Sequence, residues 1–264
     1  MIHLRTPGEM DTIAHAGSII GRLFEALSGR VQPGVSTGEI DRFAEAFIVD
    51  HEGATAAFKG LYGFPGSVCI SVNEEVVHGI PSNQRILEEG DIVSIDVGVR
   101  MDGWYSDSAR TFAVGAVSDE ATALMGVTSA ALEASIASAV PGKHVGDIGA
   151  AVVRSVQGTA YGIIRELVGH GVGRELHEEP QVPNVGRAGQ GPRLREGMVL
   201  AIEPMLSAGT PDIKTLEDGW TVITADRSLS AHFEHTVGIT KDGPRILTSA
   251  DGPVGASTPA PGTG

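Results

Sequence analysis

Two stretches near the start of the chain place hydrophobic residues at helical spacing. The first covers residues 7–29 and follows Thr6-Pro7-Gly8-Glu9, a capping box with proline at the first helical position. The second begins at the capping box Ser36-x-x-Glu39 and ends before Gly53. Its apolar face is made of Ile40, Phe43, Phe47 and Ile48. We predict two consecutive α-helices, each with one buried face.

A strand pattern appears further along the chain. Residues 92–99 alternate as a strand, Asp102-Gly103 is a hairpin turn signal, and residues 104–114 return. If these two turn residues form the loop, Gly98 lies opposite Asp107, and Asp96 lies two residues from Gly98 on the same face. Asp96 and Asp107 are then diagonal neighbours, about 7–8 Å apart at their backbones. Both side chains can reach one point.

The chain also contains two pairs of matching segments. Residues 87–97, LEEGDIVSIDV, match residues 194–204, LREGMVLAIEP, at an offset of 107. Residues 33–40 match residues 141–148 at an offset of 108, and a long helical pattern precedes each member of this pair. Similar turns before similar elements are the alternative explanation. Two matches at nearly one offset favour two homologous halves.

We therefore predict an α+β fold of two related halves, about residues 1–116 and 117–249, packed around a pseudo-twofold axis. A ligand site on such an axis draws residues from both halves. The halves together form one domain, residues 1–249. Residues 250–264 are low in complexity, and we expect a disordered tail there.

Composition narrows the class of protein. The 264 residues are 41% hydrophobic and 20% charged, which is ordinary for a globular protein with a substantial core. The net charge of −14 argues against a nucleic-acid binder, which would show a basic stripe. No apolar run approaches the roughly eighteen residues of a membrane span, and the N-terminal residues lack a secretory apolar stretch. With a single cysteine there is no disulfide framework, so we expect a cytoplasmic protein without membrane or direct nucleic-acid partners.

Acidic residues stand at apolar positions of the predicted strands. Asp96 aligns with Glu203 through the repeat, and Asp107 is the hairpin neighbour of Asp96. Glu234, on a later apolar strand, is the matching partner for Glu203. One acid of a pair facing solvent or capping a turn is the alternative. Four converging buried carboxylates would repel one another, and two divalent cations would balance them in a site suited to hydrolysis.

The segment RELVGHGVGRELHEEPQVP, residues 165–183, carries two histidines seven positions apart. This spacing excludes the helical zinc motif in which two histidines four apart share one face. A lone histidine is most often a core residue satisfied by a backbone carbonyl. In a carboxylate-rich site, however, the glycine-flanked His170 can approach closely as an imidazole ligand. His177 and His78 are left for hydrogen bonding to a substrate.

In order along the chain, five of these residues resemble the ligand set of the pita-bread metallopeptidases: Asp96, Asp107, His170, Glu203 and Glu234. The segments SVCISVNEEVVHGIP, GHGVGRELHEEP, MVLAIEPML, LEDGWTV and DRSLSAHFEHT resemble the type I methionine aminopeptidases of the short bacterial form. The resemblance covers about residues 1–248. It implies a pita-bread fold, in which two αβ halves surround a central antiparallel sheet.

The resemblance also implies how metal would be held. Asp96 would chelate one divalent ion, and His170 and Glu203 would hold the other. Asp107 and Glu234 would bridge the two ions or nearly so. The ions would be Co, Mn or Fe, which suit a site with four oxygen ligands to one nitrogen.

The implied reaction is hydrolysis of the first peptide bond, which releases the N-terminal methionine of nascent proteins and peptides. Glu203 would accept a proton, His177 would stabilise the developing oxyanion, and His78 would hydrogen-bond the scissile amide region. The partners would be nascent N-termini near the ribosome, and the protein would be a monomer.

The methionine pocket implied by the resemblance consists of Phe64, Cys69, His78, Leu176, His177 and Trp220. A lining of sulfur and aromatic groups suits a flexible thioether. Leu61 and Leu176 stand where the family often has aromatic residues, and Phe64 where it often has tyrosine, which changes the shape expected of the pocket. Ordinary core packing is the alternative for Phe64, Cys69 and Trp220.

Two rival functions share these residues. An Xaa-Pro peptidase of the same superfamily would use the same metal ligands, but such enzymes usually carry a further N-terminal domain. A non-catalytic binding protein on this fold would tend to lose ligands or histidines, and all seven positions are intact here.

Overall fold

The first two helices begin where the capping boxes predict. In the computed structural model, which describes residues 1–252, Thr6 and Ser36 are their N-caps. Thr6 Oγ1 accepts a hydrogen bond from Glu9 N at 3.3 Å, and Glu9 Oε2 accepts one from Thr6 N at 2.8 Å. Ser36 and Glu39 repeat this arrangement at 3.2 and 2.9 Å. Both capping boxes are confirmed, although the first helix ends at Leu27 and not at residue 29.

The described residues form four α-helices and one 3₁₀ turn: α1 (Pro7–Leu27), α2 (Thr37–Val49), η1 (Leu61–Gly63), α3 (Asp119–Ser138) and α4 (Val145–Val156). Within residues 1–252, every helix is too short or too polar to cross a lipid bilayer. Of the tail predicted at residues 250–264, positions 253–264 lie outside the described residues.

The strands pair antiparallel throughout the described residues. They are β1 (Ala54–Ala56), β2 (Cys69–Val72), β3 (Glu75–Val77), β4 (Ile92–Met101), β5 (Trp104–Ala113), β6 (Gly162–Ile163), β7 (Val168–Gly171), β8 (Glu178–Pro183), β9 (Val199–Ile202), β10 (Met205–Ser207), β11 (Ile213–Thr215), β12 (Val222–Thr224), β13 (Ser230–His232), β14 (His235–Thr240) and β15 (Gly243–Ile246).

Hydrogen bonding divides these strands into four sheets within the described part of the chain. The sheets have the orders β1-β4-β2 with β5 beside β4, β13-β10-β6, β11-β12-β3, and β15-β14-β9-β7-β8. Two of the interruptions fall at acidic residues. Glu203 and Pro204 separate β9 from β10, and Phe233 and Glu234 separate β13 from β14. Proline cannot donate a ladder hydrogen bond, which accounts for the first interruption.

The predicted hairpin is confirmed in its turn and its register. Asp102 and Gly103 have φ values of 52° and 74°, as a type I′ turn requires. Met101 pairs with Trp104, and Gly98 lies opposite Asp107. Asp96 and Asp107 are therefore diagonal neighbours on one face, as the alternation predicts.

The structure repeats at the predicted offset. The isolated bridge between Ser36 and Ile86 recurs between His144 and Arg193. Gly34 N donates to Leu87 O at 2.8 Å, and the equivalent glycine, Gly142, donates to Leu194 O at 2.9 Å. In each half, the segment just before a long strand thus pairs with the turn that precedes the second helix of that half. This repetition supports our proposal of two halves, about residues 1–116 and 117–249, within one domain.

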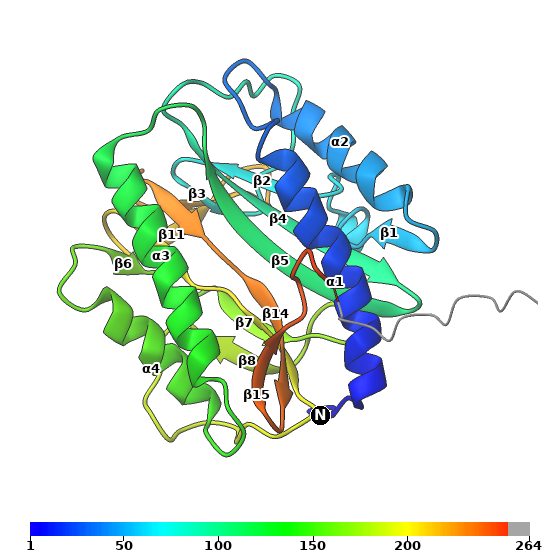
Figure 1. Cartoon of the computed structure of the whole chain (residues 1–264). Helices are drawn as coiled ribbons and strands as arrows, with labels where there is room; N and C mark the ends of the chain where they lie inside the picture. Colours follow the sequence, from blue (N-terminus) through cyan, green and yellow to red (C-terminus); the bar gives the residue numbers. More distant parts are fainter. Residues whose placement is uncertain (253–264) are drawn as a thin grey trace, which may run out of the picture.

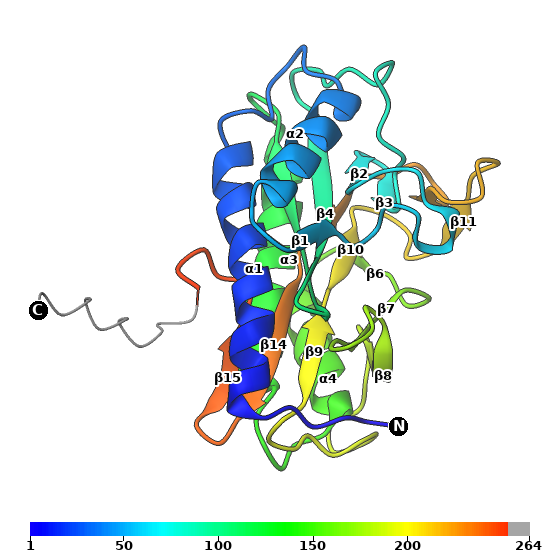
Figure 2. The same cartoon turned by 90° about the vertical axis from the view of Figure 1, so that its right-hand side faces the viewer.

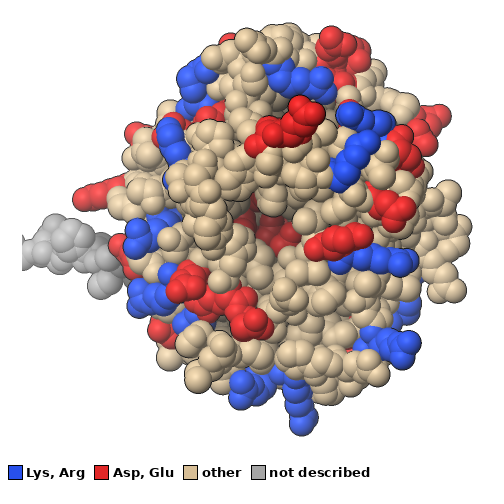
Figure 3. All heavy atoms as spheres, turned by 180° about the vertical axis from the view of Figure 1, so that it is seen from behind, with Lys and Arg blue, Asp and Glu red and all other residues tan. Residues whose placement is uncertain are grey.

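The helices lie on one side of the strands (Figures 1 and 2). In the first half, α1 packs Leu23 and Leu27 against Val93 and Ile95 of β4. In the second half, residues of α3 and α4 pack against β10 and β13. Burial of these apolar faces away from water holds the two layers together. The opposite side of the strands is left open, and Figure 3 shows a hollow in that face.

Candidate active site

Side-chain hydroxyls join β5 to the segment around β14 where the two halves meet. Thr236 Oγ1 accepts a hydrogen bond from Asp107 N at 2.9 Å and donates one to Asp107 O at 2.7 Å. Ser108 Oγ donates to Glu234 O at 2.5 Å. These groups are buried, so their hydrogen bonds form in a low-dielectric environment and hold the backbone firmly. The seam therefore fixes Asp107 and Glu234 relative to one another.

The four predicted acids line one cavity. Asp96 on β4 and Asp107 on β5 come from the first half, while Glu203 follows β9 and Glu234 precedes β14 in the second. Acidic atoms are visible on the floor of the hollow in Figure 3. The structure thus brings these carboxylates together from both halves.

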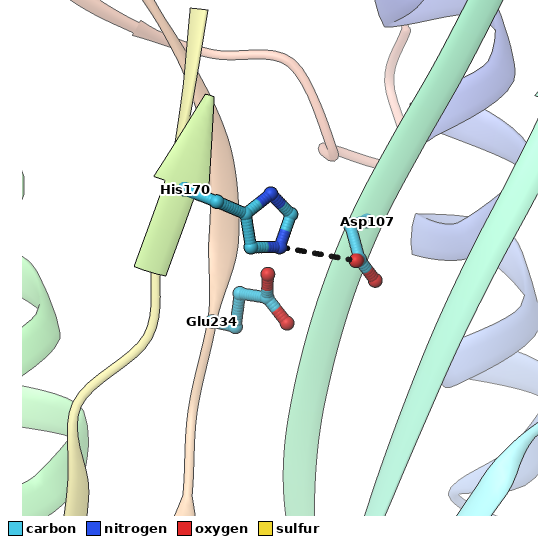
Figure 4. A group of neighbouring side chains, drawn as sticks. All are labelled: Asp107, His170 and Glu234. Atoms are coloured by element: carbon cyan, nitrogen blue, oxygen red, sulfur yellow. Dashed lines mark ion pairs between the residues drawn. The ribbon is translucent and has the colours of Figure 1, made fainter. Parts of the chain in front are cut away.

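His170 points into the same cluster (Figure 4). Its Nε2 atom lies 3.8 Å from Asp107 Oδ2 and 3.7 Å from Glu203 Oε1. Nδ1 lies 2.9 Å from Gly171 O, and because a carbonyl can only accept, Nδ1 carries the hydrogen and Nε2 presents a lone pair. Ligand atoms of Asp107, His170 and Glu234 all lie within 4.8 Å of one another. With Nδ1–H held by Gly171 O and Nε2 facing the carboxylates, His170 has the tautomer and orientation that a metal-binding histidine needs.

Glycines around His170 permit close backbone packing. A Cβ atom on Gly169 would lie 2.3 Å from Ala201 O, and one on Gly171 would lie 2.4 Å from Glu179 O. The ladder between β7 and β8 shifts register between these two glycines, so His170 sits at an irregularity of the strand. Side chains at the two glycine positions would push β7 away from its neighbours and His170 with it.

The cluster is unfavourable for four unscreened charges. Burial raises the pKa of Asp96 to about 7. Burial, with repulsion from neighbouring carboxylates, also raises the pKa values of Asp107, Glu203 and Glu234 well above their usual range. Among the described residues, Asp96 Oδ1, Asp107 Oδ1 and Glu234 Oε1 are buried with no hydrogen-bond partner. Oxygen atoms left in this way, beside an imidazole lone pair, fit divalent cations.

His177 and His78 both line the cavity that contains the carboxylates. The rings of His177 and His170 meet edge to face, with centroids 4.5 Å apart. His78 holds a left-handed backbone conformation, with φ of 60°, and burial lowers its pKa and that of His177. Both imidazoles are therefore held uncharged at neutral pH beside the carboxylate cluster. A strained non-glycine residue of this kind is often found at functional sites.

The predicted pocket residues share this cavity of about 320 Å³, which contains Phe64, Cys69, His78, Leu176, His177 and Trp220. The rings of Phe64 and Trp220 pack edge to face at 5.2 Å, and burial raises the pKa of the Cys69 thiol well above its usual range. Leu61 also lines it, and the residues that we did not predict are Phe58, Tyr62, Val77, Leu167 and Val168. Sequence reasoning missed these positions because apolar residues on short strands and in loops are equally consistent with core packing.

His232 was also missed. Its Nε2 atom lies 3.8 Å from Glu203 Oε2 and 3.9 Å from Glu234 Oε2. Burial lowers the pKa of His232 to about 3, so its imidazole is uncharged. The strand alternation contained the signal, since residues 232 and 234 are two positions apart and point to one side.

A second hollow extends from the site toward the N-terminal segment. It shares His170 and His177 with the first cavity and reaches Met1, His3 and Glu179. Arg5 and Glu178 form a partly buried ion pair in its wall. The site is thus an apolar pocket, open on the face shown in Figure 3, that continues into a more polar groove.

Comparisons with known proteins agree with this geometry. The model for Metallopeptidase family M24 matches residues 11–241. A methionine aminopeptidase of Clostridium perfringens is 50% identical over 248 residues, which cover 94% of this chain and 99% of that relative. The crystal structure of a methionine aminopeptidase from Thermotoga maritima has a TM-score of 0.92 and 42% identity, and the match covers 94% of this chain and 100% of that one.

A prolidase from Pyrococcus furiosus has a TM-score of 0.74 at 23% identity, covering 93% of this chain and 65% of that one, and shows likeness of fold alone. Together these structures confirm the predicted pita-bread fold. The chain belongs to metallopeptidase family M24, beside the methionine aminopeptidases that it matches over nearly its whole length.

Proposed function

We propose that this protein is a metalloaminopeptidase that removes the N-terminal methionine from nascent proteins and peptides. The observation that carries the proposal is the meeting of four carboxylates and an imidazole at the floor of an apolar pocket of about 320 Å³. An acidic floor attracts the positive charge of a free N-terminal amine as well as divalent cations. The pocket beside it admits the side chain of the first residue.

In this proposal, Asp96 would hold one of two divalent ions, and His170 and Glu203 would hold the other. Asp107 and Glu234, which the hydroxyl seam fixes relative to one another, would contribute to both. Bound ions would polarise the scissile carbonyl and lower the pKa of water. Cobalt, manganese and iron suit a set dominated by carboxylates.

The remaining roles belong to the chain's own side chains. Glu203 would act in its carboxylate form and accept the proton that the attacking water loses. His177 donates a hydrogen bond to the developing oxyanion, and His78 contacts the scissile amide. The lowered pKa values keep both imidazoles uncharged, and a neutral imidazole has one N–H that can donate.

Phe64, Cys69, Leu176 and Trp220 surround the methionine side chain and exclude water from it. Leu61 and Leu176 add aliphatic surface to this pocket beside the Phe64–Trp220 pair. The groove beyond His177 would receive the residues after the scissile bond. We further propose that the protein acts as a monomer in the cytoplasm, on nascent chains near the ribosome.

The test is a release assay on metal-stripped protein titrated with Mn²⁺, Fe²⁺ or Co²⁺. The substrates are Met-Ala-Ser and a matched Xaa-Pro peptide. Metal-dependent release of methionine from the first peptide alone is the expected result. Cleavage of the second alone would assign a prolidase activity. Tight binding of metal with cleavage of neither would refute the enzymatic proposal.

A further inference from the structure

His232 closes β13 at the edge of the carboxylate cluster. Its side chain is 2% exposed. Its backbone is tied to β5, because Thr111 Oγ1 accepts a hydrogen bond from His232 N and donates one to His232 O, at 2.9 Å each. The backbone of His232 is therefore held in place from the first half of the chain.

The Nε2 atom of His232 is buried without a hydrogen-bond partner among residues 1–252. It lies 3.8 Å from Glu203 Oε2 and 3.9 Å from Glu234 Oε2. Hydrogen bonds from nitrogen to oxygen extend to about 3.2 Å, so neither contact is one. Two ligands that each lie about 2.1 Å from one ion are separated by at most about 4.2 Å. Each of these two separations is within the range for two ligands of one ion.

His170 shows the same relation to the cluster from the other side. Its Nε2 atom lies 3.7 Å from Glu203 Oε1, while that of His232 lies 3.8 Å from Glu203 Oε2. Each oxygen of the Glu203 carboxylate thus faces a different imidazole nitrogen. His232 therefore meets the pairwise distances that His170 meets, while His170 alone belongs to a set of three mutually close ligand atoms among the described residues.

We propose that His232 is a second imidazole ligand of the metal centre, on the Glu203 and Glu234 side opposite His170. The inference rests on the proposed metallopeptidase function and changes its ligand set to four carboxylates and two imidazoles. A second nitrogen donor favours cobalt, iron and zinc, which bind imidazole well. It disfavours manganese and magnesium, which prefer carboxylate and water oxygens.

The first measurement is X-ray absorption of the wild-type protein loaded with two equivalents of Co²⁺. Imidazole rings give a characteristic multiple-scattering pattern, and the intensity expected is that of two rings per protein molecule. One ring per molecule would overturn the proposal. This measurement needs no variant and is independent of turnover.

The second measurement compares Co²⁺ affinity in His232→Gln and two other variants by calorimetric titration. Loss of a direct ligand should weaken one site at least about tenfold, as removal of even supporting residues does at metal sites. His170→Gln shows the size of the effect for the other imidazole. His235→Gln is the matched control, because His235 is also buried but its Nδ1 atom contacts Thr248 Oγ1 at 2.7 Å and not the carboxylates.

Unchanged affinity and unchanged ring count in His232→Gln would refute the role of His232 while leaving the metallopeptidase proposal intact. If wild-type protein bound no Co²⁺ at all, the proposed function itself would fail. A loss in His235→Gln equal to that in His232→Gln would show a general effect of removing a buried histidine, and would also overturn the assignment.

Discussion

Metal-free protein should become less stable as the pH rises from 5 to 8, and Asp96→Asn should remove much of this loss. Burial raises the pKa of Asp96 from 3.8 to about 7. The folded chain therefore binds this proton more tightly than the unfolded chain does. The resulting stabilisation is complete below about pH 4 and is lost as the pH rises through 7.

The structure sets the size of the effect. The full difference between the two pKa values corresponds to about 4 kcal/mol, of which about 2.5 kcal/mol falls between pH 5 and pH 8. Asp107 and Asp96 interact, so the pair releases its protons in two steps that belong to both residues. In a chain of this length, about 2.5 kcal/mol shifts the melting temperature by roughly 5–10 °C.

The assay is urea unfolding of chelator-treated protein at pH 5, 6, 7 and 8, followed by circular dichroism. The stability of Asp96→Asn relative to wild type should increase with pH by about 2.5 kcal/mol over this range. Asp50→Asn, which changes an exposed carboxyl, serves as the control. Parallel curves for wild type and Asp96→Asn would refute the reasoning, as would a variant that loses stability faster than wild type.

Three further outcomes follow from the geometry. His177→Ala should retain metal by elemental analysis and lose about 10²-fold in turnover, because His177 is assigned to the substrate and not to the metal. Loss of metal would contradict this assignment. Gly171→Ala should cost about 1–3 kcal/mol in urea unfolding, because its Cβ would meet Glu179 O at 2.4 Å. Gly126→Ala, in a helix with open space around it, should stabilise instead, and equal effects would be inconsistent with this account. Thr236→Val should cost about 1–3 kcal/mol by leaving Asp107 N buried and unpaired, and an unchanged unfolding midpoint would count against the seam.

Local chemistry made part of this fold predictable. The capping boxes at Thr6 and Ser36 satisfy helix-end groups with residues three positions away, so no distant contact is needed to recognise them. The Asp102-Gly103 turn fixed the hairpin register for the same reason, and with it the diagonal relation of Asp96 and Asp107. The repeat then extended this local result to Glu203.

Contacts between distant segments were not predictable in this way. Serine and threonine are common on strands, and nothing local marks Thr236 as the partner of Asp107, 129 positions earlier. The division into four sheets depends on where Pro204 and Glu234 interrupt the ladders, which alternation does not reveal. Tyr62 lines the cavity from a 3₁₀ turn of three residues, which is too short to show a hydrophobic periodicity in the sequence.

The two halves contribute unequally to the site. In the first half, Asp96 and Asp107 are eleven positions apart because a two-residue turn joins their strands. In the second, Glu203 and Glu234 are thirty-one positions apart, and β10 to β13 lie between them. This insertion carries Trp220 to the pocket and His232 to the carboxylates.

A duplicated pair of strands therefore accounts for the acids alone. All nitrogen atoms assigned here to metal, those of His170 and His232, come from the second half. Changes in the segment between Glu203 and Glu234 can alter the pocket and the metal preference together, while the hairpin still fixes Asp96 beside Asp107 and the hydroxyl seam still fixes Asp107 relative to Glu234. If His232 binds metal, the preference for a particular ion is a property of this insertion and not of the duplicated core.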